Sequence, residues 1–294
     1  MSKYYYLIAG LPNISFDDSK LPYTVSGFKD ELGNYLSDVD THLLNLFTLR
    51  FDNDNLLEQI QHPDYDPDTR GRFTNEEFNE LFKGLKREKE EEKPFINRNR
   101  RFPPYFETFA RAFMEAQEKE ETPSIPWEDY LSALYYAYAM KSRNAFVAGW
   151  FELNLNIKNI LIALACRKYK LDKASYVVGE SETARRVRTS NARDFDLGDT
   201  LEYLPAVLRI AEENDLLLRE KKVDQLKWEW LEEATVYKTF DIESVLVYLL
   251  KLEMMERWAT LDKAAGERSF RELIGSMKKG SDNVLEEFKR NNKK

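Results

Sequence analysis

The clearest candidate for chemistry in this sequence is an acidic loop, HPDYDPDTRGR, that resembles the start of a calcium-binding loop. Its alternating carboxylates are Asp64, Asp66 and Asp68. Later positions of the calcium pattern are wrong, because Thr69 stands where glycine makes the turn and Asn75 stands where a bidentate glutamate closes the shell. Pro67 also stiffens the loop. We therefore expect a solvated turn that leads into a helix capped by Thr74.

Other catalytic and metal-binding patterns are missing from the sequence. His42 and His62 are the only histidines, and no cysteine lies near them in sequence to complete a zinc site. Cys166, the single cysteine, falls on an apolar helix side and is expected to be a core residue. The phosphate-binding patterns GxGxxG and GxxxxGK[ST] and the hydrolase pattern GxSxG are absent. We predict a non-catalytic protein with no cofactor and no metal.

Composition limits the class of protein. The 294 residues are 43% hydrophobic and 13% aromatic, enough for a sizeable core. Only 11 glycines and 10 prolines favour long helices over turn-rich β structure. The net charge of −8 argues against a nucleic-acid-binding protein. The apolar run near the start is too short for a signal peptide or a membrane span, so we expect a cytoplasmic protein, or one held at a membrane face through another protein.

The elements that would position any site are helices, and the segment 146–171 is predicted to be their centre. Its apolar residues fall on two sides of a helix, so other helices should cover both sides. Further helices are expected at 38–61, 74–93, 105–121, 127–140, 201–218, 221–234 and 242–263. Residues 3–11 are predicted to be extended. The predicted fold is all-α and elongated, with three helical lobes built around long helices.

Charged residues give two weaker expectations. Two arginine clusters could contact an acidic partner or anionic headgroups, or could belong to solvated loops; they are Arg98, Arg100 and Arg101, and Arg185, Arg186 and Arg188. Glu253 and Arg257 stand four residues apart with the acid first, the better orientation for a helical ion pair.

The sequence also contains a weak internal repeat. LFTLRFDNDNLLEQI (46–60) aligns with WFELNLNIKNILIAL (150–164), pairing Phe47 with Phe151 and Asn55 with Asn159 at an offset of 104 residues. A third helix of similar character, 248–261, lies about as far downstream. Such repetition is typical of three comparable lobes, each built on one long helix.

With these features, the chain resembles the C subunit of V-type and archaeal-type rotary ATPases, called subunit d in eukaryotes. The last lobe carries the best match, FDIESVLVYLLKLEMMERWATLDKAAGERSFRELIGSM (240–277). The family-like positions are Asn55, Asn159, Tyr248, Glu253, Arg257 and Gly266. Trp258 departs from the family, which tends to have asparagine after the arginine, and the opening KYYYLIAGLPNISF is also unusual, as in a divergent bacterial branch.

The resemblance implies a non-catalytic adaptor in the central stalk of a bacterial V-type ATPase. Its expected partners are the central-shaft subunits and the membrane proteolipid ring, at the cytoplasmic face, with no nucleic acid. The implied lobes span residues 1–102, 103–198 and 199–294. A free-standing helical scaffold unrelated to ATPases is the alternative.

Overall fold

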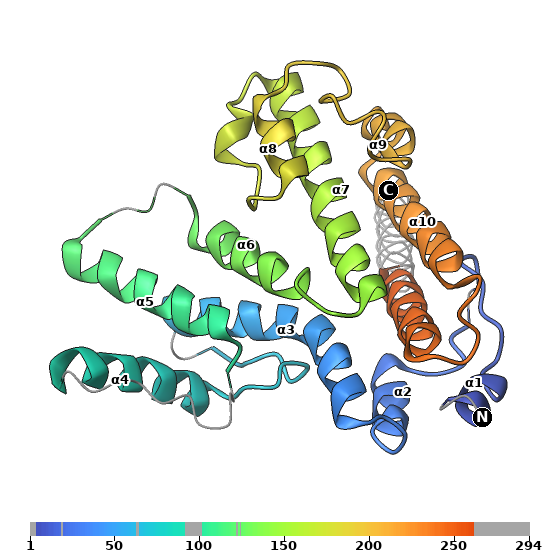
Figure 1. Cartoon of the computed structure of the whole chain (residues 1–294), viewed down its shortest axis with the longest axis horizontal. Coiled ribbons are helices and arrows are strands. Elements are labelled where there is room, and N and C mark those ends of the chain that lie inside the picture. The colour runs from blue at the N-terminus through green and yellow to red at the C-terminus, as the bar shows by residue number, and fades with distance from the viewer. Residues whose placement is uncertain are drawn as a thin grey trace, which may run out of the picture. The chain divides into compact units, whose positions relative to one another are not determined.

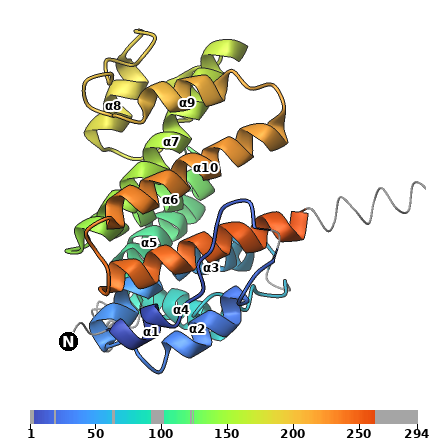
Figure 2. The same cartoon turned by 90° about the vertical axis from the view of Figure 1, so that its right-hand side faces the viewer.

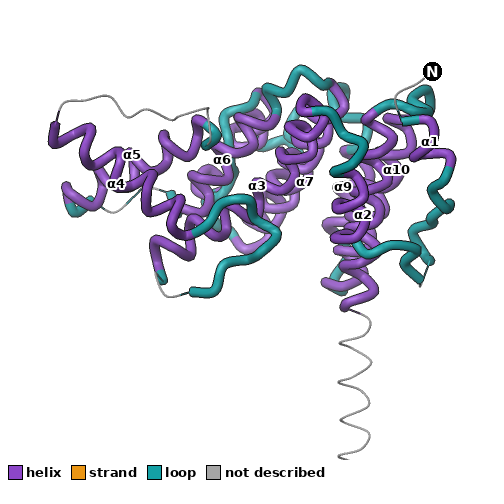
Figure 3. The backbone as a smooth tube through the Cα atoms, turned by 90° about the horizontal axis from the view of Figure 1, so that it is seen from below, coloured by secondary structure: helices purple, strands orange, loops and turns teal. Residues whose placement is uncertain are grey.

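A computed structural model describes residues 4–18, 20–62, 65–91, 102–121, 123 and 125–261. Within these ranges every regular element is a helix, which confirms the predicted all-α fold (Figure 3). The elements are α1 (Tyr5–Ala9), α2 (Val25–Leu32), α3 (Asp38–Gln61), α4 (Asn75–Glu91), α5 (Pro104–Lys119), α6 (Trp127–Ala139), α7 (Ala145–Tyr169), the short 3-10 helix η2 (Lys173–Ser175), α8 (Glu182–Thr189), α9 (Leu204–Ala211), α10 (Leu216–Thr235) and a helix over residues 242–261. None of the described helices is both long and apolar enough to cross a membrane.

Helix starts follow from capping side chains. The Asn144 side chain accepts the N–H of Val147 at 3.1 Å and so caps α7. At α4 the predicted cap is confirmed and is reciprocal: Thr74 Oγ1 accepts the N–H of Glu77 at 3.3 Å, and the Glu77 carboxylate accepts the N–H of Thr74 at 2.8 Å. These bonds satisfy backbone donors that a helix leaves unpaired at its first turn.

Two sequence-based expectations about secondary structure are wrong. The described part of segment 3–11, from Tyr4 onward, is not extended, because a helical turn places Tyr4 and Leu7 on one side, where both are buried. Residues 201–218 do not form one helix. The helix α9 ends at Ala211, and the Asp215 carboxylate accepts the N–H of Leu218 at 3.0 Å, which starts α10 as a separate helix.

One compact unit of the chain spans Leu36–Trp230, and α7 is central to it. Figure 1 shows α6 beside both α3 and α7, with α5 against α6, α4 against α3 and α5, and α8 and α9 against α7. Phe47 of α3 and Phe151 of α7, paired in the repeat, stack with ring centroids 5.2 Å apart. Tyr135 of α6 meets the edge of Phe151 at 5.4 Å. The predicted central position of this helix is therefore confirmed.

The other compact unit is formed by Met1–Tyr35 and Leu231–Lys294. In its described part, the N-terminal segment lies along the helix over residues 242–261 (Figure 2). Phe28 of α2, which is fully buried, approaches Tyr248 at 5.1 Å between ring centroids. The division into three lobes at residues 102 and 198 stays a prediction.

Candidate functional site

Asn55, on α3, ties its helix to the acidic loop that follows. Its side-chain amide donates to the carbonyl of Asp68 at 3.0 Å, and its side-chain oxygen accepts the N–H of Asp68 at 2.8 Å. The Tyr65 hydroxyl donates to the backbone carbonyl of Asn55 at 2.7 Å, and burial raises the pKa of Tyr65 to about 12. Asn55 is 2% exposed, so this two-bond tie is shielded from water.

Asn159, its partner in the repeat, makes the same tie on α7. Its amide donates to the carbonyl of Val178 at 2.8 Å, and its side-chain oxygen accepts the N–H of Val178 at 2.9 Å. Asparagine suits this role because one side chain offers both a donor and an acceptor, matching a peptide group. The weak sequence repeat thus corresponds to a repeated tertiary contact.

The helix over residues 242–261 makes related contacts in the other compact unit. Glu256 accepts the N–H of Val25, at the start of α2, at 3.1 Å. Glu253 forms an ion pair with Lys29 at 2.9 Å. Acidic or amide side chains three residues apart occur in all three helices, as Asp52 with Asn55, Asn156 with Asn159, and Glu253 with Glu256. In each helix the second member holds the backbone of another segment.

Asp52, one turn before Asn55, is a fully buried carboxylate. Its Oδ1 accepts the N–H groups of Arg72 at 2.5 Å and Phe73 at 3.0 Å, while Oδ2 is buried with no hydrogen-bond partner among the described residues. Burial raises the pKa of Asp52 to about 6, against the lowering effect of those two N–H groups and of the Arg72 charge. The equivalent position on α7, Asn156, carries no charge and donates to the Tyr203 hydroxyl at 3.0 Å.

Gly71 lets the loop approach α3 closely. A Cβ atom at this position would lie 2.6 Å from the side-chain nitrogen of Asn55 and 2.9 Å from Oδ1 of Asp52. Both atoms are held in place by their own bonds to the loop. The sequence interpretation did not identify Gly71, although glycine beside two buried polar side chains is a recognised sign of close backbone approach.

Of the remaining family-like positions that the structure describes, Tyr248 serves packing and Arg257 lies on the surface. Tyr248 is 9% exposed, its hydroxyl is buried without a hydrogen-bond partner in the part of the chain that the structure describes, and burial raises its pKa to about 12. Arg257 is exposed, with its guanidinium 5.4 Å from the ring centroid of Trp258. Gly266 lies outside the described residues.

The second arginine cluster lies on and beside α8 and is partly engaged in the fold. The Arg188 guanidinium donates to the carbonyl of Val177 at 2.9 Å and also to that of Gly179. Arg186 pairs with Glu182 at 2.5 Å one turn away. These contacts leave Arg185 as the most exposed of the three, and they hold Arg188 in a structural position. The first cluster, Arg98, Arg100 and Arg101, lies outside the described residues.

The acidic loop makes protein contacts through the residues that the structure describes. The Asp68 carboxylate pairs with Arg70 at 2.5 Å, and this hydrogen-bonded contact lowers the pKa of Asp68. Asp66 is exposed, and Asp64 lies outside the described residues. Among described residues, no three His, Cys, Asp or Glu side chains are grouped to hold a metal ion.

The other sequence-based candidates are placed as expected. Cys166 is buried as a free thiol, and burial raises its pKa, which disfavours the reactive thiolate. His42 and His62 are exposed, and His62 follows the last turn of α3. Among the described residues, the contacts of Asn55 and Asn159 therefore point to an anchoring role between helix and loop.

The chain belongs to a protein family described as "Protein of unknown function (DUF2764)", whose model matches residues 1–281. Neither the comparison with curated proteins nor that with solved structures found a match.

Proposed function

We propose that this protein is a non-catalytic adaptor in the central stalk of a bacterial V-type rotary ATPase. It would join the rotor shaft to the membrane proteolipid ring and act at the cytoplasmic face without itself entering the membrane. The proposal starts from the sequence resemblance to the C subunit of these enzymes.

The observation that best supports the proposal is the repeated anchor. The resemblance implies comparable lobes, each built on a long helix that carries a polar residue. Asn55 and Asn159 occupy those positions, and each makes the same two hydrogen bonds to the backbone N–H and carbonyl of one residue in a downstream loop. Shared helical periodicity alone would align apolar residues without giving the two asparagines one tertiary role.

A torque-transmitting part must be stiff, and these ties contribute stiffness. A buried side chain that satisfies both backbone polar groups of one loop residue fixes the loop to its helix, because releasing it would leave buried groups unpaired. Stacked Phe47 and Phe151 add a direct contact between α3 and α7. Such a body needs no reactive group to do its work.

The test is an affinity purification from the native host. The chain, tagged at its native locus, is purified from membranes solubilised in mild detergent, and the recovered proteins are identified by mass spectrometry. The proposal expects proteolipid and central-shaft subunits in proportion to the bait. A tagged, unrelated acidic helical protein of similar size serves as the control.

A well-folded bait that recovers no ATPase subunits would contradict the adaptor assignment. The protein would then be a free-standing helical scaffold, the second candidate. A variant with all three of Arg185, Arg186 and Arg188 changed to glutamate asks whether that cluster contacts the ring. Unchanged recovery of the ring, with folding verified by circular dichroism, would remove the cluster from the interface.

A further inference from the structure

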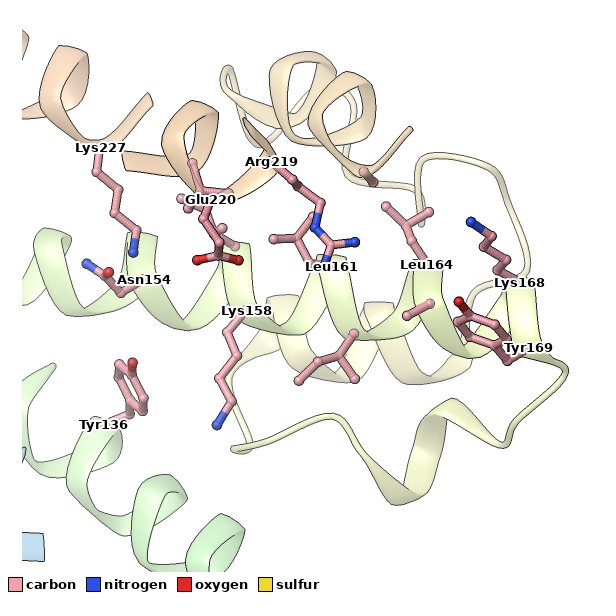
Figure 4. A pocket seen from close by; sticks show the side chains of 15 residues that line it. Tyr136, Asn154, Lys158, Leu161, Leu164, Lys168, Tyr169, Arg219, Glu220 and Lys227 are labelled. Atoms are coloured by element: carbon pink, nitrogen blue, oxygen red, sulfur yellow. The ribbon is translucent and has the colours of Figure 1, made fainter. Parts of the chain in front are cut away.

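A groove of about 500 Å³ runs along α7 in the unit Leu36–Trp230, between α7 and the first half of α10 (Figure 4). Its floor is apolar and comes mainly from one side of α7, with Ile157, Leu161, Ile162, Leu164 and Ala165. Ile157 is buried, whereas Leu161, Ile162 and Leu164 are half-buried and Ala165 is exposed. A helix stripe that stays partly uncovered in this way is available for contact with another apolar surface.

The rim of the groove is cationic, although the whole protein is acidic. Figure 4 shows Arg219, Glu220 and Lys227 reaching from α10 toward α7, with Lys158 and Lys168 on α7 itself. Glu220 is the only acidic residue of the lining. Within the described residues, no ion pair involves Arg219 or Lys168, and the nearest carboxylate to Lys158 is that of Asp129 at 3.8 Å. This concentration of positive charge contrasts with a net charge of −8 for the chain.

The repeat indicates that only part of this apolar floor distinguishes α7 from α3, because Leu161 and Leu164 align with Leu57 and Ile60. At the same offset of 104 residues, Ile162 aligns with Glu58 of α3, and Ala165 aligns with Gln61. Glu58 and Gln61 are exposed, as polar residues on a solvated helix side should be. Since the two helices share their buried anchors, the apolar residues at positions 162 and 165 are not required by the repeated architecture.

The apolar surface also continues past the groove along α10. Leu216 lies one turn before Glu220 and so falls on the same side of the helix. Leu216 is 64% exposed, and Tyr169, which lines the groove at the C-terminal end of α7, is 67% exposed. These large exposed apolar side chains lengthen the surface that one bound element could cover.

We propose that this groove binds an amphipathic helix of a partner protein whose apolar stripe is flanked by acidic residues. The apolar floor would take the stripe, and Lys158, Lys168 and Arg219 would pair with its flanking carboxylates. The chain's own last residues, 262–294, fit poorly because they carry nine Lys and Arg against six Asp and Glu. The inference does not depend on the ATPase assignment.

The experiment uses the full chain and synthetic peptides. A fluorescent helical peptide of about 18 residues, or five turns, carries a leucine stripe flanked by glutamates; a second replaces every glutamate with lysine. Binding is read by fluorescence anisotropy at two salt concentrations. The groove variant is K158E/K168E/R219E, and the matched control is K83E/K86E/K119E, which changes the net charge equally at exposed positions elsewhere. Circular dichroism verifies that both variants fold.

The proposal expects the acidic peptide to bind the wild type and the control alike, to bind the groove variant at least tenfold more weakly, and to bind less tightly as salt rises. No binding of the acidic peptide, equal binding of the lysine peptide, or equal weakening by both variants would overturn it. Two other results would also overturn it: loss of binding to anionic phospholipid vesicles only in the groove variant, with no peptide binding, or a wild-type dimer that only the groove variant dissociates.

Discussion

The anchors of α3 and α7 use one geometry but differ in charge. Asn55 and Asn159 each hold the backbone N–H and carbonyl of one residue with two hydrogen bonds, over sequence separations of 13 and 19 residues. One turn earlier, α3 carries the carboxylate Asp52 and α7 carries the amide Asn156. Asp52 holds two further N–H groups of the loop, whereas Asn156 bonds a tyrosine hydroxyl.

The two helices therefore share the pair of hydrogen bonds made by asparagine, whereas the residue one turn earlier differs between them in charge and in partner. In the first region a buried carboxylate extends the tie to Arg72 and Phe73, at the cost of burying a charge. In the second region a neutral amide bonds the Tyr203 hydroxyl instead, and the loop is held at Val178 by Asn159 and at the neighbouring carbonyls by Arg188. The first anchor should therefore respond to pH, and the second should not.

The largest expected effect comes from removing the shared tie. Asn159→Ala leaves the buried N–H and carbonyl of Val178 without partners, and should lower the free energy of unfolding by about 3 kcal/mol. Asn55→Ala should cost a similar amount, because its two bonds are equivalent. Chemical denaturation measures both. Asn154→Ala, which removes a local bond to the carbonyl of Trp150, is the control and should cost much less. Equal losses of unfolding free energy in Asn154→Ala and Asn159→Ala would contradict the anchoring role of Asn159.

Adding a methyl group at Gly71 should lower the free energy of unfolding nearly as much. Gly71→Ala forces a Cβ against the fixed side chains of Asn55 and Asp52, and should cost about 2 kcal/mol in unfolding free energy. Gly198→Ala is matched to it, since its Cβ would lie 2.9 Å from the Asp194 carboxylate, a single side-chain group that is only half-buried and can move. We expect Gly198→Ala to lose less than half as much unfolding free energy as Gly71→Ala. Equal losses in the two variants would show that the acidic loop shifts easily to make room for the added methyl group.

Asp52→Asn should remove a pH dependence of the unfolding free energy that arises at the α3 anchor and has no counterpart at the α7 anchor. The folded pKa of Asp52, about 6, lies above the usual 3.8, so the folded state binds more protons than the unfolded state between these values. Its contribution to stability is therefore present below about pH 4 and is lost as pH rises through 6. Relative to wild type, the asparagine variant should gain about 1–2 kcal/mol from pH 4 to pH 7.

Denaturation curves for wild type and variant at matched pH values measure this gain, because the contributions of other carboxylates, such as Asp68, cancel in the difference. A difference that stays constant across this range would show that Asp52 does not titrate there. No such pH dependence is expected for Asn156→Ala.

The smallest expected effect is at Arg257. Its side chain is exposed, and Glu253 pairs instead with Lys29 of α2. Arg257→Ala should change the unfolding free energy by less than about 0.5 kcal/mol, as is typical of exposed charges. Lys29→Ala should cost more, because it leaves the 12%-exposed Glu253 carboxylate without this partner. A loss of several kcal/mol in unfolding free energy for Arg257→Ala would show that Arg257 belongs to a buried network of interactions.

Most of the helical architecture was predictable because the apolar periodicity of a long helix is contained in its own sequence. The helix α3 has the predicted bounds, and α7 differs from them by one or two residues. Short or polar connections were harder. Nothing in residues 201–218 alone shows that Asp215 begins a new helix, since its carboxylate could equally sit mid-helix on a solvated side.

The anchors were predictable only in part. Asn55 and Asn159 were found as matching positions, but their partners, Asp68 and Val178, could not be found from spacing, because the two loops differ in length and sequence. The ion pair of Glu253 was assigned to Arg257, four residues away, when Lys29 lies in a helix more than 200 residues distant in sequence. Pairing rules along one helix cannot anticipate contacts made by tertiary packing.

The sequence by itself determined an acidic, all-α protein with a central helix, a repeated asparagine position and no pattern typical of an enzyme. Composition, periodicity and capping are local properties, and they can be read without knowing which segments meet. Only the tertiary structure decided that the two asparagines hold loops by the same pair of bonds and that Asp52 is buried beside one of them. It also decided that cationic side chains from α7 and α10 border one apolar groove. Each of these depends on long-range packing, which sets burial and brings distant segments into contact.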